Sequence, residues 1–405
     1  MLLRTKRQSP MTDMKTILHT HAMLITSFRC TRWNSRSFSV YRLALLVFFY
    51  FVAQSAAFAD DQALPALPAT EKPTLNFQDI IAMLDHTDKH FSYLGTKFVI
   101  DYSPARRSTT LVKVTYGGAA GLEKKEVAPL QRGQESQIIL DDGNFLWHYI
   151  PSKASVVKKQ RRLSLSEISD KIRHQHTLIE ANYDIAIEMT TQVGAASDSA
   201  EIPSVFGDVM VAFQPKGKDR PSWKIWIEQG HGLVVRTEIY NMQGDLALLS
   251  AFSELTFTPE IAKQAFVMTV PEGTQMQTSI EKHFRTIEEA QKEVSFAIRL
   301  PNYMPAGFIL TSIIYSPVKR GEKVQLAYID GLSLISIFEE RRAATPESSE
   351  QATKEVEIKQ SVKGTFYDHG LLKILRWQLD AERMLTLVGE VADHELLKIA
   401  ASITP

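Results

Sequence analysis

Few side chains in this sequence stand at spacings that support catalysis or metal binding. His174-Gln-His176 would place two imidazoles on one face of a strand, but on a helix residues two apart diverge, and no third ligand stands nearby. Asp141-Asp142-Gly143 lacks the oxygen spacing of a calcium loop and is typical of a turn. The sequence has no Gly-x-Ser-x-Gly elbow and no glycine-rich phosphate loop. We therefore predict no enzymatic activity, no catalytic residue, no metal and no cofactor.

The strongest charge cluster is Lys158-Lys-Gln-Arg-Arg162. It suits contact with acidic lipid headgroups or with an acidic loop of a partner, and the alternative is a solubilising edge or loop. The whole chain has 46 basic and 46 acidic residues, so no basic excess favours nucleic-acid binding. The cluster alone therefore indicates a surface and not a nucleic-acid site.

Aromatic residues on alternating positions are the feature that most needs an explanation. In 96–102, Phe98, Ile100 and Tyr102 share one strand face, and Lys97 and Asp101 take the other. We expect one face of a curved sheet to line a lipid-binding cavity with Phe98, Ile100, Trp147, Tyr149, Trp223 and Ile225. If helices cover this face closely it is a packed core, and if they cover it loosely it is a cavity of lipid size.

The elements that position these residues are mostly strands. Apolar residues at helical spacing predict a helix at Phe77–His90, and a capping box at Ser164-Leu-Ser-Glu167 predicts another at Leu165–His176. Strands are predicted at 96–102, 111–116, 145–149, 182–189, 205–214, 222–228, 233–240 and 246–256. Turn signals separate them and no regular helical crossover recurs, which favours one long antiparallel sheet.

The composition, with 44% apolar and 23% charged side chains, indicates a globular protein. A chain of 405 residues is longer than a single hydrophobic core usually serves, so we expect two domains. We place a large domain at 75–273, a linker at 274–285 and a small domain at 286–405. The small domain is predicted to begin with a short capped helix at Thr286. Its strands are expected at 309–315, 323–328, 332–338, 371–378 and 384–388, with a hairpin turn at Asp330-Gly331 and a final helix at His394–Ser402.

The N-terminus is typical of a secretory signal. Residues 1–59 hold eight basic residues and one acid, and the apolar run Leu43–Ala53 leads to the small residues Ala57-Phe58-Ala59. That run is too short for the roughly 20 residues of a membrane span. We predict cleavage after Ala59, a flexible lead-in at 60–74 and a soluble exported chain of net charge −7; the alternative is an uncleaved anchor. Translation from Met11, Met14 or Met23 would shorten the leader, and the only cysteine, Cys30, lies within it.

Several segments, taken in order, resemble the MucB/RseB family. In the large domain these are Phe91–Ile100 (FSYLGTKFVI), Leu111–Tyr116 (LVKVTY), Glu123–Pro129 (EKKEVAP), Asp142–Tyr149 (DGNFLWHY), Trp223–Ile227 (WKIWI) and Gly232–Asn241 (GLVVRTEIYN). In the small domain they are Leu300–Phe308 (LPNYMPAGF), Tyr328–Phe338 (YIDGLSLISIF) and Val388–Val391 (VGEV) with the helix that follows. The resemblance covers nearly all of 77–403, and its specificity lies in the ordered set.

The resemblance implies an α+β protein: a large curved antiparallel half-barrel covered by helices, like LolA and LolB, followed by a smaller α/β domain. It implies a periplasmic regulator of the sigma-E envelope-stress response that binds the periplasmic part of a single-span anti-sigma factor and shields it from proteolysis. Lipoprotein acyl chains or lipopolysaccharide would release that partner. The small domain also resembles modules of other exported regulators and of sporulation proteins, which leaves the partner less defined than the fold.

Strand faces in the small domain suggest Tyr328, Asp330, Phe338 and Trp377 as partner-binding residues. Two other functions stay open. A lipid or lipoprotein carrier needs the same cavity but only one domain, and a ligand-free scaffold needs only a surface that binds protein.

Overall fold

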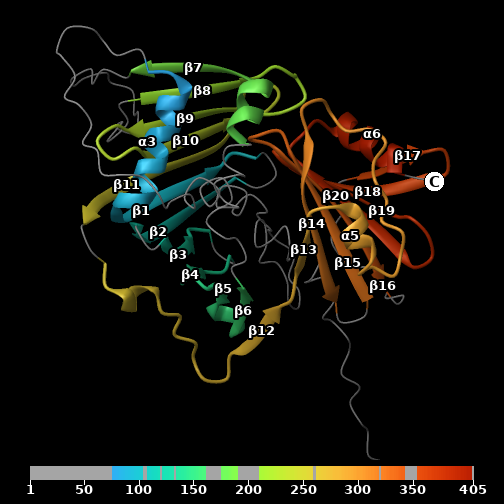
Figure 1. Ribbon diagram of the computed structural model, residues 1–405, viewed down its shortest axis with the longest axis horizontal. Helices are drawn as coiled ribbons and strands as arrows, with labels where there is room; N and C mark the ends of the chain where they lie inside the picture. Colours follow the sequence, from blue (N-terminus) through green and yellow to red (C-terminus); the bar gives the residue numbers. More distant parts are fainter. Residues whose placement is uncertain are drawn as a thin grey trace, which may run out of the picture.

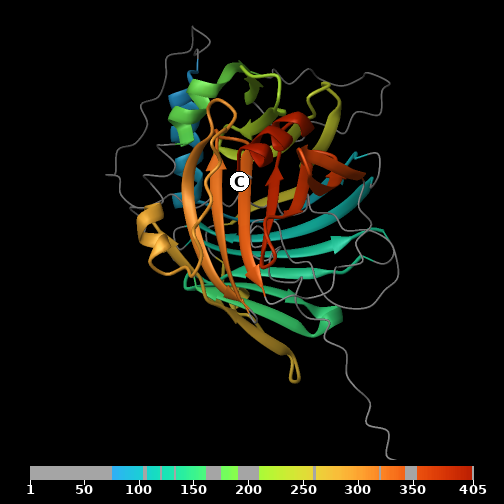
Figure 2. The same ribbon diagram turned by 90° about the vertical axis from the view of Figure 1, so that its right-hand side faces the viewer.

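The computed structural model describes residues 75–103, 107–118, 121–131, 134–160, 175–189, 209–258, 261–318, 321–342 and 354–403. These residues form two β-sheets, of twelve and eight strands, with helices packed on them (Figure 1). The strands of the two sheets run at a steep angle to each other, and the second sheet lies across one side of the first (Figure 2). The predicted α+β class with a large curved sheet is confirmed.

The first sheet has the strand order β12-β6-β5-β4-β3-β2-β1-β11-β10-β9-β8-β7. Its strands are β1 (Ser92–Asp101), β2 (Ser108–Gly117), β3 (Leu122–Pro129), β4 (Gln137–Asp141), β5 (Phe145–Ile150), β6 (Ser155–Gln160), β7 (Tyr183–Met189), β8 (Val209–Pro215), β9 (Ser222–Glu228), β10 (Leu233–Tyr240), β11 (Leu246–Thr258) and β12 (Gln275–Ser279). Short 3₁₀ turns occur at η2 (Pro151–Lys153) and η3 (Lys263–Phe266). Neighbouring strands pair antiparallel except β12, which pairs parallel with β6.

Helix α3 (Phe77–His90) covers part of this sheet and has the predicted bounds. Asn76 and Asp79 form reciprocal caps, because each side chain accepts a hydrogen bond from the other residue's backbone N–H at 2.8–3.0 Å. Figure 1 shows α3 lying over β8 to β11, with a second short helix, 175–182, near β7. The predicted helix Leu165–His176 lies mostly outside the described residues.

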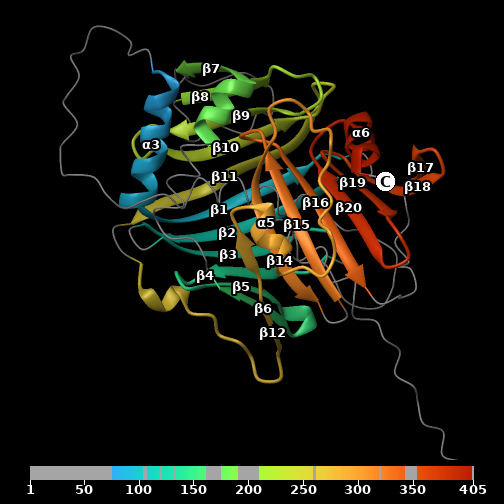
Figure 3. The ribbon, with the colours of Figure 1, turned by 45° about the vertical axis from the view of Figure 1, so that its right-hand side comes forward.

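The second sheet has the order β13-β14-β15-β16-β20-β19-β18-β17 and is antiparallel. Its elements are β13 (Lys282–Phe284), α5 (Ile287–Gln291), β14 (Ile309–Val318), β15 (Gly321–Ile329), β16 (Leu334–Arg342), β17 (Lys354–Lys359), β18 (Val362–His369), β19 (Leu372–Gln378), β20 (Arg383–Gly389) and α6 (Asp393–Ile403). Figure 3 shows α5 and α6 on the side of this sheet that faces away from the first sheet. Thr286 caps α5 by accepting a hydrogen bond from the backbone N–H of Glu289, at 3.2 Å, as the sequence predicts.

Strands whose alternation is strong were predicted closely, and β9 and β10 have the predicted bounds. Among the described strands, the sequence did not predict β3, β4, β6, β12, β13, β17 and β18. Strand β3 places charged residues on both faces, and β12 is polar and short. The segment 274–285, predicted as a linker, contains β12 in one sheet and β13 in the other. The division into a large and a small domain stays a prediction.

Buried apolar side chains form three clusters among the described residues. One fills the space under α5 and α6 on the second sheet. Another lies on β1, β2, β3, β10 and β11. The third, named here the junction core, joins α3 and β7 to β11 with the second sheet, which contributes Leu332, Phe338, Leu371, Leu372, Ile374 and Val388. No helix in the described ranges is long and apolar enough to cross a membrane.

Candidate functional site

A buried polar network joins the two sheets at Asp330. The Asp330 carboxylate accepts hydrogen bonds from Arg220 Nη1 at 2.8 Å and from the Tyr183 hydroxyl at 2.9 Å, and both donors belong to the first sheet or its turns. The backbone N–H groups of Leu332 and Ser333 donate to its other oxygen at 3.0 and 2.7 Å. The Asp330-Gly331 turn, which the sequence predicts, thus places the Asp330 carboxylate against donors of the first sheet.

Further hydrogen bonds cross the same junction. Asn182 Nδ2 donates to the carbonyl oxygens of Gly307, at 3.2 Å, and of Asp330, at 2.9 Å. Arg220 Nη2 donates to the carbonyl oxygen of Ala306 at 2.8 Å. The backbone N–H of Ala392, just before α6, donates to the carbonyl oxygen of Asp219 at 2.8 Å. Bonds at several points along one contact give the two sheets a defined relative orientation.

Two glycines allow the chains to approach this closely. Gly331 has φ +111°, and a Cβ there would lie 2.7 Å from Ile179 Cγ1 and 2.8 Å from the Ile179 nitrogen. Gly307 has φ +89°, and a Cβ there would lie 2.0 Å from Asn182 Oδ1. Both the backbone conformation and the space therefore require glycine.

The charges at the junction are compensated within it. Burial raises the pKa of Tyr183 well above its ordinary value, so its hydroxyl remains a donor. Burial alone would lower the pKa of Arg220, but the carboxylates of Asp330 and Asp219 prevail and raise it. Burial raises the pKa of Asp330, opposed by Arg220 and by the donated N–H groups. The four donors on its oxygens favour the ionised form of Asp330.

Glu390 lies close to this network without a compensating cation in the described residues. Its carboxylate accepts from the backbone N–H of Leu334 at 3.3 Å. Burial, reinforced by the charge of Asp330, raises the pKa of Glu390 to about 8. Beside the Arg220–Asp330 ion pair, the junction therefore holds a carboxyl group whose pKa favours the protonated form at neutral pH. This arrangement positions two sheets and offers no nucleophile and base pair for catalysis.

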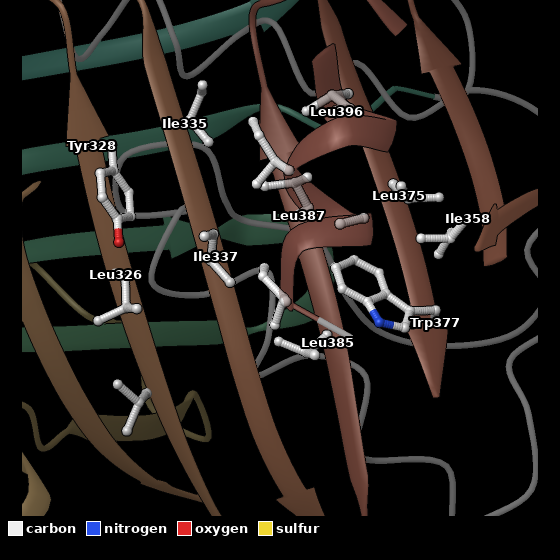
Figure 4. Close-up of a cluster of buried hydrophobic side chains, with 14 of the residues drawn as sticks. Leu326, Tyr328, Ile335, Ile337, Ile358, Leu375, Trp377, Leu385, Leu387 and Leu396 are labelled. Carbon is white, nitrogen blue, oxygen red and sulfur yellow. The ribbon is translucent and has the colours of Figure 1, made fainter. Parts of the chain in front are cut away.

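The predicted partner-binding residues are buried, which corrects the expectation that they face a partner. Tyr328 and Trp377, 8% and 2% exposed, lie in the cluster under α6 (Figure 4). Phe338, 1% exposed, belongs to the junction core, and Asp330, 0% exposed, to the polar network. An eight-stranded sheet packed on both faces buries residues of either parity, so alternation could not tell an interior face from a partner-facing one.

The six predicted cavity residues do not share a face, which is a second correction. The register pairs Val99 with Ser250, Ser250 with Thr237 and Thr237 with Ile225, so Ile225 and Trp223 share a face with Val99. Phe98, Ile100, Trp147 and Tyr149 project from the opposite face. Trp223 and Ile225, 3% and 2% exposed, are packed in the junction core with Phe77 of α3. At these two residues the filled-core alternative holds.

The interior of strand β1 is polar where the sequence suggested an apolar one. Lys97 and Asp101 are 6% and 4% exposed, whereas Phe98 and Ile100 are only half-buried. Lys125, on β3, is also buried and pairs with Glu123 at 2.5 Å. Burial, and then the charge of Lys125, lowers the pKa of Lys97 to about 7. The pattern itself was recognised correctly, but the identity of the inner face was wrong.

Within the basic run at 158–162, Lys158 lies on the same face of the first sheet as Trp147. Lys158 Nζ lies 3.6 Å from the ring centre of Phe145 and 4.4 Å from that of Trp147, a cation–π arrangement. Lys159 pairs with Glu281 at 2.5 Å. Arg161 and Arg162 lie outside the described residues.

The two motifs considered for metal binding have other structures. The Asp142 carboxylate accepts from the backbone N–H groups of Asn144 and Phe145, and its other oxygen accepts from Trp147 Nε1 at 2.7 Å, as expected of a turn. His174 lies outside the described residues, and the ring of His176 packs edge-on against Phe77, where burial lowers its pKa to about 4. Within the described ranges no group of three or more acidic, histidine or cysteine side chains could hold a metal ion.

The fold defines an α+β protein in which a large curved antiparallel sheet with helices on it carries a smaller sheet across one side. The chain is similar to MucB in the structure of the Pseudomonas aeruginosa MucA/MucB complex, with 18% identity, a TM-score of 0.49 and coverage of 81% of this chain and 98% of that one. It is also similar to an uncharacterized conserved protein of Thermus thermophilus, with 13% identity, a TM-score of 0.33 and coverage of 50% and 98%.

A curated relative matches over a shorter stretch. Over 159 residues the chain is 26% identical to the uncharacterized protein MJ0687 of Methanocaldococcus jannaschii, a match that spans 38% of this chain and 46% of that protein. The chain thus spans less than half the length of that relative. No protein-family model matches the chain.

Proposed function

We propose that this chain is an exported, periplasmic regulator that binds the segment of a single-span anti-sigma factor lying outside the cytoplasm. Binding would shield that segment from the protease that begins its destruction. The ordered resemblance to the MucB/RseB family is the observation that carries the proposal. MucB itself has been solved in complex with MucA of Pseudomonas aeruginosa.

The placement of the resembling segments supports this proposal. They fall on β1, β2, β3, β5, β9 and β10 of the first sheet and on β15, β16, β20 and α6 of the second. They therefore come from both sheets and include the Asp330 turn that joins them. A ligand can alter such a junction only by binding one arrangement of the sheets more tightly than another. Acyl chains or lipopolysaccharide would act in this way.

The test uses the exported segment of the single-span protein encoded beside a sigma factor gene in the same genome. Residues 60–405 and this segment, both purified, should form a stable complex on size-exclusion chromatography and slow cleavage of the segment by its protease. The absence of a complex at micromolar concentrations would contradict the proposal. N-terminal sequencing of the exported protein should begin at Asp60.

A lipid carrier and a ligand-free scaffold are separated from this regulator by one measurement. Organic extraction of the purified protein followed by mass spectrometry should recover bound lipid if the protein senses or carries lipid. Recovery of lipid without any anti-sigma complex would favour the carrier. A complex without lipid would favour the scaffold, which agrees with the packed surroundings of Trp223 and Ile225.

A further inference from the structure

The chain crosses from one sheet to the other along an exposed ribbon, Gln275–Phe284. Strand β12 is the outermost strand of the first sheet and β13 is the outermost strand of the second, and only Ile280 and Glu281 separate them. Figure 1 shows β12 leading up towards β13 at the lower side of the junction. In the described part of the chain, no strand pairs with the outer edge of either.

Strand β12 differs from the other terminal strands in having no charged residue. The edge strand β7 exposes Asp184 and Glu188, and β17 exposes charged residues at four of its six positions. Charges of this kind protect an edge from pairing with another strand. By contrast, β12 has the sequence Gln-Met-Gln-Thr-Ser, and its first four residues are exposed on both faces. Among the described residues, its outer edge has no paired strand and no charge of its own that would prevent pairing.

The direction of the backbone groups on β12 follows from one hydrogen bond. The N–H of Gln275 donates to the carbonyl oxygen of Ala154 at 2.7 Å, and so points towards β6. Because N–H and C=O groups alternate sides along a strand, those of Met276 and Thr278 point outward. An extended polypeptide is the ligand that matches this spacing of donors and acceptors.

The side chains indicate the chemistry of that polypeptide. Met276, on β12, and Ile280, just beyond its end, are 54% and 61% exposed, which suits apolar residues on an added strand. Towards β13, the half-exposed Lys282 pairs with Glu293 at 2.5 Å, and His283 lies 3.7 Å from Glu281, which is 2% exposed and also paired with Lys159.

From this edge we infer that β12 is the docking site for the anti-sigma segment, which adds to the first sheet as an extended strand. This inference rests on the proposed function and names its binding surface. Because the ribbon continues into β13, a strand that extends past Ile280 would contact both sheets. Its affinity would then depend on how the two sheets are oriented.

Proline substitutions on β12 test the outward N–H groups, because proline has no backbone N–H. Met276→Pro with Thr278→Pro removes two outward N–H groups and retains the N–H groups that point to β6. The matched control, Met276→Ala with Thr278→Ala, removes the same side chains and keeps every N–H group. Calorimetric titration with the exported anti-sigma segment should show affinity at least about tenfold weaker for the proline variant than for the alanine variant, because only the proline variant lacks the two outward donors.

A second measurement avoids substitutions altogether. Hydrogen exchange of the unaltered protein should show the amides of Met276 and Thr278 becoming protected when the segment binds. Equal affinity of the two variants, or amides that stay unprotected in the complex, would overturn the docking site and leave the proposed function intact. Failure of the unaltered protein to bind would count against both. Dimerisation that the proline variant abolishes would assign the edge to a second copy and overturn the inference.

Discussion

Asp330 shows how a single side chain links the two sheets. Its carboxylate is fully buried and accepts hydrogen bonds from Arg220 and Tyr183, which lie across the junction. A buried ion pair adds little net stability by itself, but the loss of one partner leaves an uncompensated charge in the interior. The effect of a substitution here therefore depends on the partner that remains.

Asp330→Asn should lower the free energy of unfolding by about 3–5 kcal/mol, because it leaves the Arg220 guanidinium buried without a counter-charge. Urea denaturation measures the change. Adding Arg220→Met should cost less than the sum of the two single variants, since the pair is then removed together. A control on the exposed pair Lys363–Glu355, Glu355→Gln, should change the free energy of unfolding by less than about 0.5 kcal/mol. Additive effects of the two junction variants would contradict the described contact.

Glu390 makes stability depend on pH. Its pKa is about 8 in the folded protein and 4.5 in its unperturbed form, so the folded state keeps a proton that the unfolded state releases. The contribution of Glu390 to stability should therefore fall as pH rises from about 4.5 to about 8, with a slope of at most about 1.4 kcal/mol per pH unit, and level off above that range. Thermal unfolding of Glu390→Gln should show a smaller decline across this window than the unaltered protein. Parallel curves for the two proteins would contradict the buried, protonated carboxyl group.

At the scale of elements, turns decide how closely the sheets can pack. The turn between β15 and β16 approaches the helix 175–182 through Gly331, which has a positive φ and no room for a side chain. The turn between β10 and β11 contains Gly244, with φ +87° and nothing within 4 Å of the position of a Cβ. Both glycines have a positive φ that would strain another residue, but only Gly331 lies close to another segment of the chain.

This difference separates strain from packing. Gly244→Ala should destabilise the protein by about 1 kcal/mol through the backbone alone. Gly331→Ala should cost at least about 2 kcal/mol more, because its Cβ also meets Ile179. Equal losses in the free energy of unfolding of the two variants, measured by chemical denaturation, would contradict a steric clash between residue 331 and Ile179.

At the scale of the whole molecule, the junction core makes the two sheets depend on each other. It contains α3 residues, strands β7 to β11 and six side chains of the second sheet. Each sheet would expose part of this apolar surface if separated. A change in their orientation is therefore opposed by hydrophobic burial as well as by the polar network.

A fragment of residues 60–273 should expose the apolar surface that the second sheet now covers. We expect it to bind the dye ANS more strongly than residues 60–405 do, and to unfold at a lower temperature. Dye fluorescence and thermal melting measure both effects. A fragment as stable as the complete chain, with no added dye binding, would contradict the shared core.

Local patterns determined a large part of this protein from the sequence alone. The period of two in 222–228 predicted β9 to the residue, and the bounds predicted for 233–240 match β10. The capping pattern at Thr286 predicted the start of α5, and Asp330-Gly331 predicted a hairpin turn. These features follow from neighbours in the chain, whose spacing fixes side-chain direction and turn geometry.

Only the tertiary structure decided which face is interior. Lys97 and Asp101 alternate with Phe98 and Ile100, and hydrophobicity favoured burying the second pair, yet the sheet buries the first. The same holds for Asp330, whose burial depends on Arg220, 110 residues away in the chain. A buried charge is tolerated only where distant groups compensate it, and such partners carry no local signal in the sequence.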